Sequence, residues 1–212
     1  MKNKSKNILL GAVIGVLAVG VVASIGSALN EENGWWDNLK ADIEEKLNED
    51  VAAKNILDVN NLKAGVYSKD IKTGNFTIHA TDEKSVEILE QDIFYTDESN
   101  ETYEFTQRLR FGGAGSLDYR SIEFNITETS DVNFYFRSPT SGSARTFNIY
   151  ELVDGEIGES IATHTSSSDQ TVTFATEELE EGTYVVYGSA ALDFYRVEIN
   201  SIEDTETVTS EA

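Results

Sequence analysis

The segment of residues 103–126, which reads YEFTQRLRFGGAGSLDYRSIEFNI, constrains most strongly what this chain can fold into. Its apolar residues Tyr103, Phe105, Leu109 and Phe111 share one parity, and polar or charged residues share the other. Such alternation is typical of a strand with one buried face, because successive side chains of a strand point to opposite sides of the sheet. The glycines that follow separate this run from a second one. The segment therefore predicts two strands joined by a glycine turn.

The same alternation continues along the chain from Gly65 onward, and it predicts about nine short strands. Beyond the first segment, the alternating runs lie around Phe76 and Ile78, Val86 and Ile88, Val132 and Phe134, Phe147 and Ile149, Val172 and Phe174, Tyr184 and Val186, and Tyr195 and Val197. Glycine, serine and aspartate turns separate them at intervals that suit antiparallel sheets. We therefore predict an all-β fold, an antiparallel β-sandwich that is jelly-roll-like, over residues 62–200, with residues 201–212 as an acidic disordered tail.

The first 28 residues have the features of an export signal. Three lysines, at positions 2, 4 and 6, precede an uncharged run of 19 residues that ends at a small-residue cleavage site, Gly26-Ser27-Ala28. The run is long for a cleaved signal peptide and long enough to span a bilayer as a hydrophobic helix, so both a signal peptide and a signal anchor stay open. In both cases the module is expected to be extracellular, either secreted or anchored to the membrane by its N-terminal helix.

Residues 29–61 are predicted to hold a short amphipathic helix and a linker. Apolar residues recur there every three or four positions, at Trp36, Leu39, Ile43, Leu47 and Val51. One interpretation is a stalk, or a helix docked on the module. The other is that the two adjacent tryptophans lie among the headgroups of a membrane that the preceding helix still spans.

The charge balance limits the possible partners. All 38 acidic residues but only 13 of the 16 basic residues lie beyond Ala28, which gives that part of the chain 25 excess negative charges. This excess argues against nucleic acid as a partner. An acidic surface keeps an exported protein soluble, and the alternative is that acid pairs hold a divalent cation. No pair follows the spacing of a calcium loop. A structural calcium ion is therefore a possibility whose ligands the sequence does not identify. No other cofactor is expected.

No catalytic residue is predicted from the sequence. The chain has no cysteine, which excludes a disulfide, a thiolate metal site and a cysteine nucleophile. His79 and His164 lack the spacing of a zinc pair and are interpreted as surface residues, and there is no G-x-S-x-G elbow. We therefore expect a protein that is not an enzyme.

Four segments carry patterns that occur together in one family. They are residues 75–88, 103–124, 143–158 and 181–199, and they include T-x-R-L-x-F-G-G-x-G-S from Thr106, R-S-I from Arg120, R-T-F-x-x-Y from Arg145 and G-T-Y from Gly182. In this order they resemble the jelly-roll-like β-sandwich modules appended to bacterial pectate lyases and other secreted polysaccharide-active or cell-surface proteins. The resemblance implies association with carbohydrate or cell-wall glycan. It does not imply lyase activity, because 212 residues hold no counterpart of the catalytic β-helix.

The use of arginine is uneven along the chain. Residues 85–212 contain six arginines and no lysine, although 26 acidic residues lie in the same span. Arginine forms paired hydrogen bonds to carboxylates and stacks on aromatic rings, which lysine does less well. By strand parity, the outward-facing arginines are Arg108, Arg110, Arg137 and Arg196, placed among Glu104, Glu123 and Glu198. We expect cross-strand ion pairs on this exposed face.

Arg120 and Arg145 differ from the others, because each shares parity with the core residues that follow it. One interpretation is that they pair with Asp118 or Asp193 and join two loops at one end of the sandwich. The other is a cup in which tyrosine rings stack on a sugar and an arginine holds a hydroxyl or a uronate carboxylate. The candidate ligand-binding residues are Tyr119, Arg120, Arg145, Tyr187, Asp193 and Tyr195.

Two functions follow from these patterns. The first is an exported, non-catalytic, carbohydrate-binding-like β-sandwich at the cell surface or in the envelope. The excess negative charge favours neutral or short glycans over a long polyanion. The second is a structural or protein-interaction module of the envelope that has no glycan site.

Overall fold

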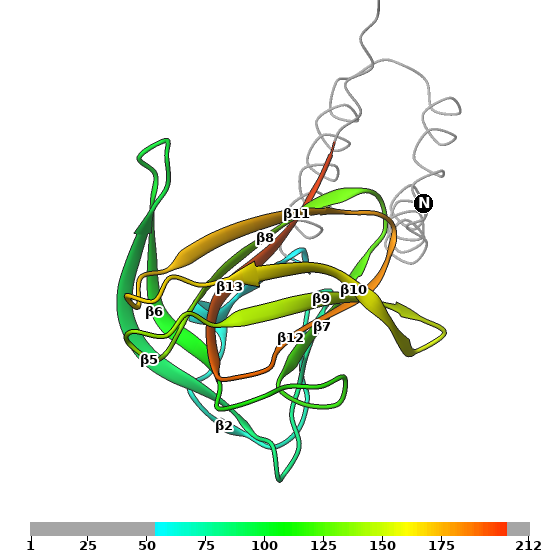
Figure 1. The fold of residues 1–212 in the computed structure, drawn as a ribbon, viewed down its shortest axis with the longest axis horizontal. Helices are drawn as coiled ribbons and strands as arrows, with labels where there is room; N and C mark the ends of the chain where they lie inside the picture. The colour runs from blue at the N-terminus through cyan, green and yellow to red at the C-terminus, as the bar shows by residue number, and fades with distance from the viewer. Residues whose placement is uncertain (1–53, 203–212) are drawn as a thin grey trace, which may run out of the picture. The chain divides into compact units, whose positions relative to one another are not determined.

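The computed structural model describes residues 54–202 (Figure 1). The predicted export segment, the predicted amphipathic helix up to residue 53 and the tail from residue 203 lie outside the described residues. Strand β1 (Ile56–Asp58) already pairs with the last strand, so the sheets include residues ahead of the predicted boundary at residue 62. Within residues 54–202, no helix has the length and apolar character needed to cross a membrane.

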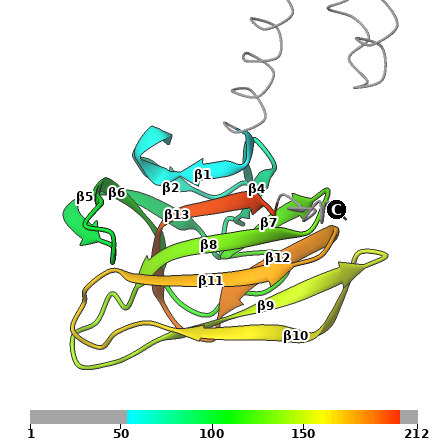
Figure 2. The ribbon, with the colours of Figure 1, turned by 90° about the horizontal axis from the view of Figure 1, so that it is seen from above.

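Two antiparallel sheets make up the fold, and their strands appear as two layers in Figure 2. Sheet A has the order β11-β8-β13-β6-β5-β2, with β1 also paired to β13, and sheet B has the order β10-β9-β12-β7-β4-β3. The remaining strands are β2 (Gly65–Tyr67), β3 (Ile71–Thr73), β4 (Phe76–His79), β5 (Val86–Thr96), β6 (Thr102–Phe111), β7 (Ser121–Ile126), β8 (Ser130–Arg137), β9 (Thr146–Val153), β10 (Glu156–Thr165), β11 (Thr173–Leu179), β12 (Gly182–Gly188) and β13 (Leu192–Ser201). The predicted all-β antiparallel sandwich is confirmed.

Most connections carry the chain from one sheet to the other. From β6 to β9 every connection crosses between the sheets, and so does every connection from β10 to β13. The hairpins β5–β6 and β9–β10 stay within one sheet. Repeated crossing of this kind is the connection pattern of a jelly roll, in agreement with the predicted jelly-roll-like fold.

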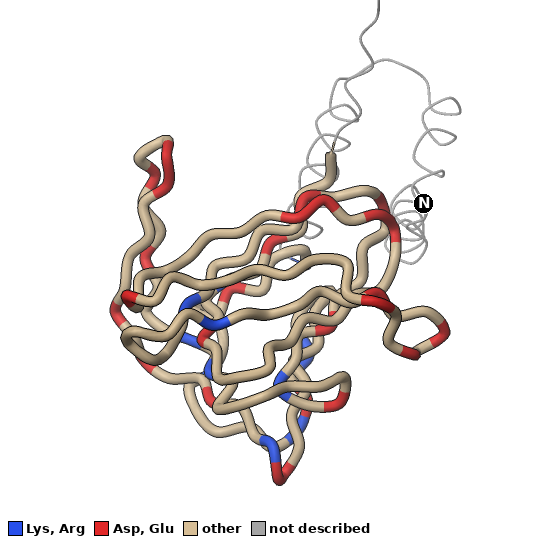
Figure 3. The backbone as a smooth tube through the Cα atoms, in the orientation of Figure 1, with Lys and Arg blue, Asp and Glu red and all other residues tan. Residues whose placement is uncertain are grey.

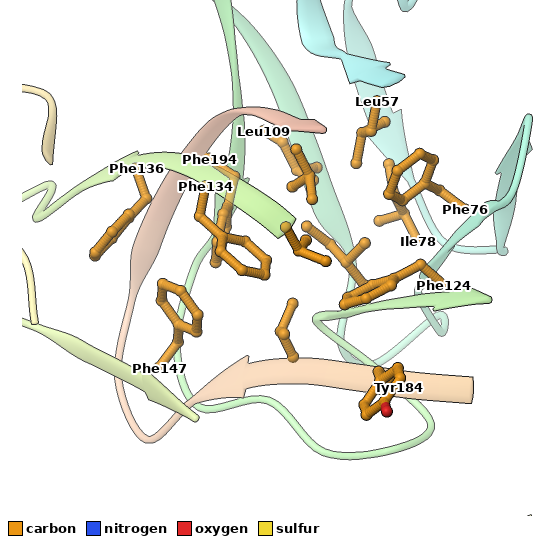
Figure 4. Close-up of a cluster of buried hydrophobic side chains, with 14 of the residues drawn as sticks. Leu57, Phe76, Ile78, Leu109, Phe124, Phe134, Phe136, Phe147, Tyr184 and Phe194 are labelled. Atoms are coloured by element: carbon orange, nitrogen blue, oxygen red, sulfur yellow. The ribbon is translucent and has the colours of Figure 1, made fainter. Parts of the chain in front are cut away.

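The main core lies between the two sheets and is rich in phenylalanine (Figure 4). Its fully buried aromatic residues are Phe76, Phe111, Phe124, Phe134, Phe136, Phe147 and Phe194. Leu109 and Phe111 point into this core, as the alternation of the first segment predicts. Burying one such side chain contributes about 1.5–3 kcal/mol, so the alternating pattern fixes which face of each strand turns inward.

Strand β6 follows sheet A for only part of its length. It pairs with β13 through Leu192–Phe194 alone, and beyond Phe194 the register of β13 shifts while β1 takes the neighbouring position. The pairing of β5 with β6 is also irregular between Glu90 and Ile93. The far half of the β5–β6 hairpin therefore bends away from the sheet, as Figure 1 shows.

The bent hairpin builds a second aromatic cluster, separate from the main core. Phe105, Tyr135, Val172 and Tyr195 are buried in it. The Phe105 ring centroid lies 5.1 Å from that of Tyr195, and the Tyr103 centroid lies 5.2 Å from that of Tyr135. The prediction that Phe105 shares the core face of Leu109 is therefore wrong. The register irregularity of the hairpin places Phe105 in the second cluster, although the parity of the two residues is the same.

The Asn60 side chain forms hydrogen bonds with the backbone of β6 in the part of that strand that does not pair with β13. Asn60 lies in the 3-10 helix η1 (Val59–Asn61), and its Oδ1 accepts hydrogen bonds from the amides of Thr106 at 2.8 Å and Gln107 at 3.2 Å. Its Nδ2 donates to the carbonyl of Glu104 at 3.0 Å. One side chain thus replaces a short piece of neighbouring strand, and its backbone partners would otherwise lack these bonds.

We expect Asn60→Ala to lower the free energy of unfolding by about 1–3 kcal/mol, because the amides of β6 lose their acceptor. Urea unfolding of the full chain, followed by circular dichroism, measures the change. The matched control is Asn61→Ala, since Asn61 is exposed and its replacement should change stability by less than about 0.5 kcal/mol. Equal effects of the two substitutions would contradict this role of Asn60.

Candidate functional site

Five of the six predicted ligand-binding residues divide between two places in the structure, and the sixth, Arg145, is described below. Asp193 and Tyr195 lie on β13, and both side chains are buried among residues on the outer side of sheet A. Tyr187 lies on β12 of sheet B, and the loop that holds Tyr119 and Arg120 packs against it. The single cup that joins all six residues is therefore not formed. Tyr195 in particular is covered and presents no open ring to a ligand.

The loop between β6 and β7 is tied closely to the end of β12. The amide of Gly115 donates to the carbonyl of Gly188 at 2.9 Å, and a Cβ on Gly115 would lie only 2.8 Å from the Cβ of Tyr187. Glycine is needed at position 115 because any side chain would meet Tyr187 and the backbone of Arg120. The glycine turn of the first segment thus lets this loop approach Tyr187.

Arg120 adopts an unusual backbone conformation at the end of the same loop. Its φ is 51°, which residues other than glycine rarely adopt. Its amide donates to the carbonyl of His79 at 2.7 Å, and its Nε donates to the carbonyl of Ser85 at 3.2 Å. The guanidinium lies over Gly113, where a Cβ would come within 2.9 Å of Nη1. Backbone strain of this kind is concentrated at functional sites, which makes the Arg120 loop a candidate.

The predicted pairing of Arg120 and Arg145 with Asp118 or Asp193 is wrong. Within residues 54–202, neither arginine lies within ion-pair distance of a carboxylate. The Arg145 backbone is held instead by Ser166, whose Oγ accepts from the Arg145 amide at 3.0 Å. The buried Nε of Arg145 has no hydrogen-bond partner among the described residues.

Tyr187 stacks on a second tyrosine that the sequence analysis did not select. The rings of Tyr187 and Tyr150, on the neighbouring strand β9, lie 4.7 Å apart between centroids at an angle of 18°. Burial, and to a smaller extent a hydrogen bond with Tyr150, raises the pKa of Tyr187 to about 12, so the Tyr187 hydroxyl stays protonated at neutral pH. Asn148 donates to the Tyr150 hydroxyl at 3.2 Å. Tyr150 is diagonal to Tyr187 in the strand register, and this cross-strand relation is the signal that could have identified it.

Asp193 is the centre of the second group of predicted residues, on the outer side of sheet A. Its fully buried carboxylate accepts hydrogen bonds from Arg108 at 3.1 Å, from Arg110 at 2.9 and 3.2 Å, and from Arg137 at 3.4 Å. Arg108 and Arg110 turn away from the main core, as parity predicts, but the prediction that these three arginines form ion pairs with glutamates on an exposed face is wrong, because their partner is the buried Asp193 and Arg137 is itself buried. Hydrogen bonds from Arg110 to Asp193 raise the pKa of Arg110, with further contributions from the charges of Asp193 and Glu87.

Arg137 extends this group to two further segments. Its Nη2 donates to the Oε1 of Gln91 at 2.9 Å, and its Nη1 donates to the carbonyl of Gln170 at 3.3 Å. Its guanidinium carbon lies 5.9 Å from the centroid of the Tyr195 ring, within the range of a cation–π contact. The group therefore joins β5, β6, β8, β13 and the loop before β11. We call Arg108, Arg110, Arg137 and Asp193 the arginine cluster.

The arginine cluster contrasts with the rest of the molecule in charge. Figure 3 shows red segments at several loops, and blue segments on strands near the middle of the molecule as well as at the lower loops. Arg196, the remaining outward arginine, forms ion pairs with Glu198 and, across the strands, with Asp58. The cross-strand pairing predicted for the outward arginines thus holds for Arg196 and Asp58.

The two histidines are less exposed than predicted. His79 lies between Asp70 and Glu123, 3.2 Å from an oxygen of each, and His164 lies 3.3 Å from Glu177. Their side chains are 16% and 17% exposed, so both are surface residues that neighbouring side chains partly cover. In residues 54–202, no group of three or more histidine or acidic side chains is placed to hold a metal ion. The structural calcium ion stays a prediction.

No family model matches the chain, and no curated protein matches it. Among solved structures, it is similar to CBM51-2 with the INT domains of Clostridium perfringens ZmpB, at 14% identity and a TM-score of 0.36 over 70% of this chain and 32% of that one. It is similar to CBM35 from Paenibacillus barcinonensis at 16% identity and a TM-score of 0.37, over 65% of this chain and 99% of that one.

A third similar structure is CBM51 from Clostridium perfringens GH95 in complex with methyl-galactose, at 10% identity and a TM-score of 0.36, over 68% of this chain and 99% of that one. The chain thus spans about a third of the ZmpB structure. Likeness at this level assigns no ligand or site to this chain, and the fold assignment rests on the strand pairing described above.

We expect Asp193→Asn to lower the free energy of unfolding by about 3–5 kcal/mol, because it leaves three guanidinium groups without their buried counter-charge. Asp118→Asn is the matched control, since the Asp118 side chain is exposed and should contribute less than about 0.5 kcal/mol. Urea unfolding at neutral pH measures both. A change of less than about 1 kcal/mol for Asp193→Asn would show that the cluster does not depend on this charge.

We also expect the free energy of unfolding to fall as the pH rises above 10. Burial raises the pKa of Tyr135, Tyr184 and Tyr195 above the ordinary value of 10.0, so the unfolded chain loses protons that the folded chain keeps. By linkage, the stability from these tyrosines is complete below pH 10 and is lost as the pH approaches their folded-state pKa values. Urea unfolding at about pH 8 and about pH 11 tests this expectation, and equal free energies would disprove it.

Proposed function

We propose that this chain is an exported, non-catalytic β-sandwich that binds carbohydrate at the cell surface or in the envelope. The observation that carries the proposal is the stacked pair of Tyr150 and Tyr187 beside the strained loop of Arg120. We call Tyr150, Tyr187 and the loop residues Tyr119 and Arg120 the tyrosine site.

The chemistry of the tyrosine site suits a sugar. An aromatic ring provides an apolar face for the C–H groups of a pyranose, and the tyrosine hydroxyls provide hydrogen-bond donors. Tyr187 is half-buried and fixed from two sides, by Tyr150 and by Gly115. A ring that is already held in place loses little conformational entropy when a ligand binds. This favours direct stacking of a sugar on the pair.

The surroundings of the tyrosine site favour a neutral or short glycan. The chain carries a formal net charge of −22. Glu123 on β7 and Glu151 on β9 lie opposite β12 residues in the strand register, and these β12 residues are close in sequence to Tyr187. A long polyanion would be repelled by this field unless cations bridged the charges. The resemblance to modules of secreted polysaccharide-active proteins supports a carbohydrate ligand and an extracellular location.

A structural or protein-interaction module is the second candidate, and exposed apolar side chains favour it. Phe94 on β5 is 59% exposed, and Phe174 on β11 is 37% exposed. Strand β11 is an edge strand of sheet A, and within residues 54–202 no strand pairs with its outer edge. Such an edge can pair with a strand of another protein. In this case the partner would be an envelope protein, with no role for the tyrosine site.

We expect the full chain to retain a defined neutral glycan on a glycan array, and Tyr187→Ala to weaken that binding at least tenfold. Loss of one aromatic stacking surface at a sugar site removes about 1–3 kcal/mol. The matched control is Phe94→Ala, which removes an exposed ring far along the chain from the site and should leave binding unchanged. If no glycan is retained, or if Phe94→Ala weakens binding as much as Tyr187→Ala does, the proposal fails and the protein-interaction module is favoured.

A further inference from the structure

The arginine cluster contains more positive charge than is needed to join its strands by an ion pair. One carboxylate with one arginine is enough to join two strands, yet Arg108, Arg110 and Arg137 all converge on Asp193. Among the described residues, no other carboxylate lies within ion-pair distance of these three guanidinium groups. The four residues of the cluster therefore carry a net charge of +2, which Glu87, opposite Arg110 on β5, offsets in part.

Hydrogen-bond donors in and beside the cluster remain without acceptors. The bonds from Arg110 to Asp193 use its Nε and Nη2, and Arg108 bonds Asp193 through Nη1. The buried Nε of Arg108 has no hydrogen-bond partner within residues 54–202, and neither has the hydroxyl of Tyr195, which is fully buried next to Arg137. Buried donors of this kind are costly unless an acceptor meets them.

Part of the cluster can be reached from solvent. The Arg110 side chain is 27% exposed and the Arg108 side chain 16%, whereas Arg137 is 9% exposed and forms bonds through all three of its nitrogens. Arg137 is therefore a positioning residue that fixes the carboxylate of Asp193. Arg110 and Arg108 are the groups that an incoming ligand can meet.

We propose that Arg110 and Arg108 bind the carboxylate of an acidic saccharide, at a second site separate from the tyrosine site. A carboxylate accepts hydrogen bonds from the guanidinium nitrogens that Asp193 does not engage, Nη1 of Arg110 and Nη2 of Arg108, and it neutralises part of the excess charge. The choice of a saccharide rests on the proposed function, but the positive charge and the free donors do not.

The second aromatic cluster adjoins the arginine cluster. Tyr195 packs against Arg137 on one side and against Phe105 of the second aromatic cluster on the other. Tyr95 and Tyr103 cover that cluster and are half-buried, and they lie on the same β5–β6 hairpin as Arg108 and Arg110. The acidic remainder of the chain disfavours a long polyanion, which restricts the ligand to one or a few uronate units.

Calorimetric titration of the full chain with glucuronate and with glucose tests this proposal, because the two sugars differ in one carboxylate. We expect glucuronate to bind more tightly than glucose, with an affinity that falls as sodium chloride is added. Arg110→Gln should weaken glucuronate binding at least tenfold, Arg110→Lys less, and the control Phe94→Ala not at all, while Tyr187→Ala reports separately on the tyrosine site. The urea midpoint of each variant checks that it is folded.

Two results would overturn the second site. One is glucuronate binding that Tyr187→Ala abolishes and Arg110→Gln leaves unchanged, since the carboxylate would then be held at the tyrosine site. The other is the absence of any difference between glucuronate and glucose. Failure of the tyrosine site alone has a different signature, because neutral glycans would then not bind while glucuronate still responds to Arg110→Gln.

Discussion

The buried carboxylate of Asp193 is the interaction on which the arrangement of sheet A depends. It lies in the three-residue stretch where β13 still pairs with β6, and it accepts hydrogen bonds from arginines of β6 and β8 as well. Immediately beyond it β6 leaves the sheet and the hairpin bends outward. The ion pairs hold these strands together where the backbone ladder ends, and removal of the carboxylate would leave three cations to repel one another.

The departure of β6 from the sheet gives the two outer faces of the sandwich different chemistry. On sheet A it places aromatic rings of the hairpin beside the arginine cluster, where charge dominates. On sheet B the same segment of sequence continues through a glycine loop that reaches Tyr187, where a stacked aromatic pair dominates. A single stretch of chain, residues 103–126, thus contributes to both proposed sites.

Much of this fold could be predicted because the alternation of apolar residues reports directly on burial. Leu109 and Phe111 enter the core and Arg108 and Arg110 turn away from it, as parity requires. The partner of the arginines could not be predicted, because Asp193 is more than 80 positions away along the chain and only strand pairing brings it near. Parity does not show which residues pack together across a register irregularity, so it does not place Phe105 in the second aromatic cluster. Parity within one strand also does not show that Tyr150 lies diagonal to Tyr187 on the neighbouring strand.

A double-mutant cycle on Asp193 and Arg110 tests the central claim most directly. The free energies of unfolding of Asp193→Asn, Arg110→Gln and the double variant are compared with that of the unaltered chain. If Asp193 balances an excess of positive charge, removal of Arg110 should lessen the cost of Asp193→Asn, so the double variant is less destabilised than the sum of the two by about 1–3 kcal/mol. Additive effects would show that the carboxylate and the guanidinium act independently, and would contradict the account.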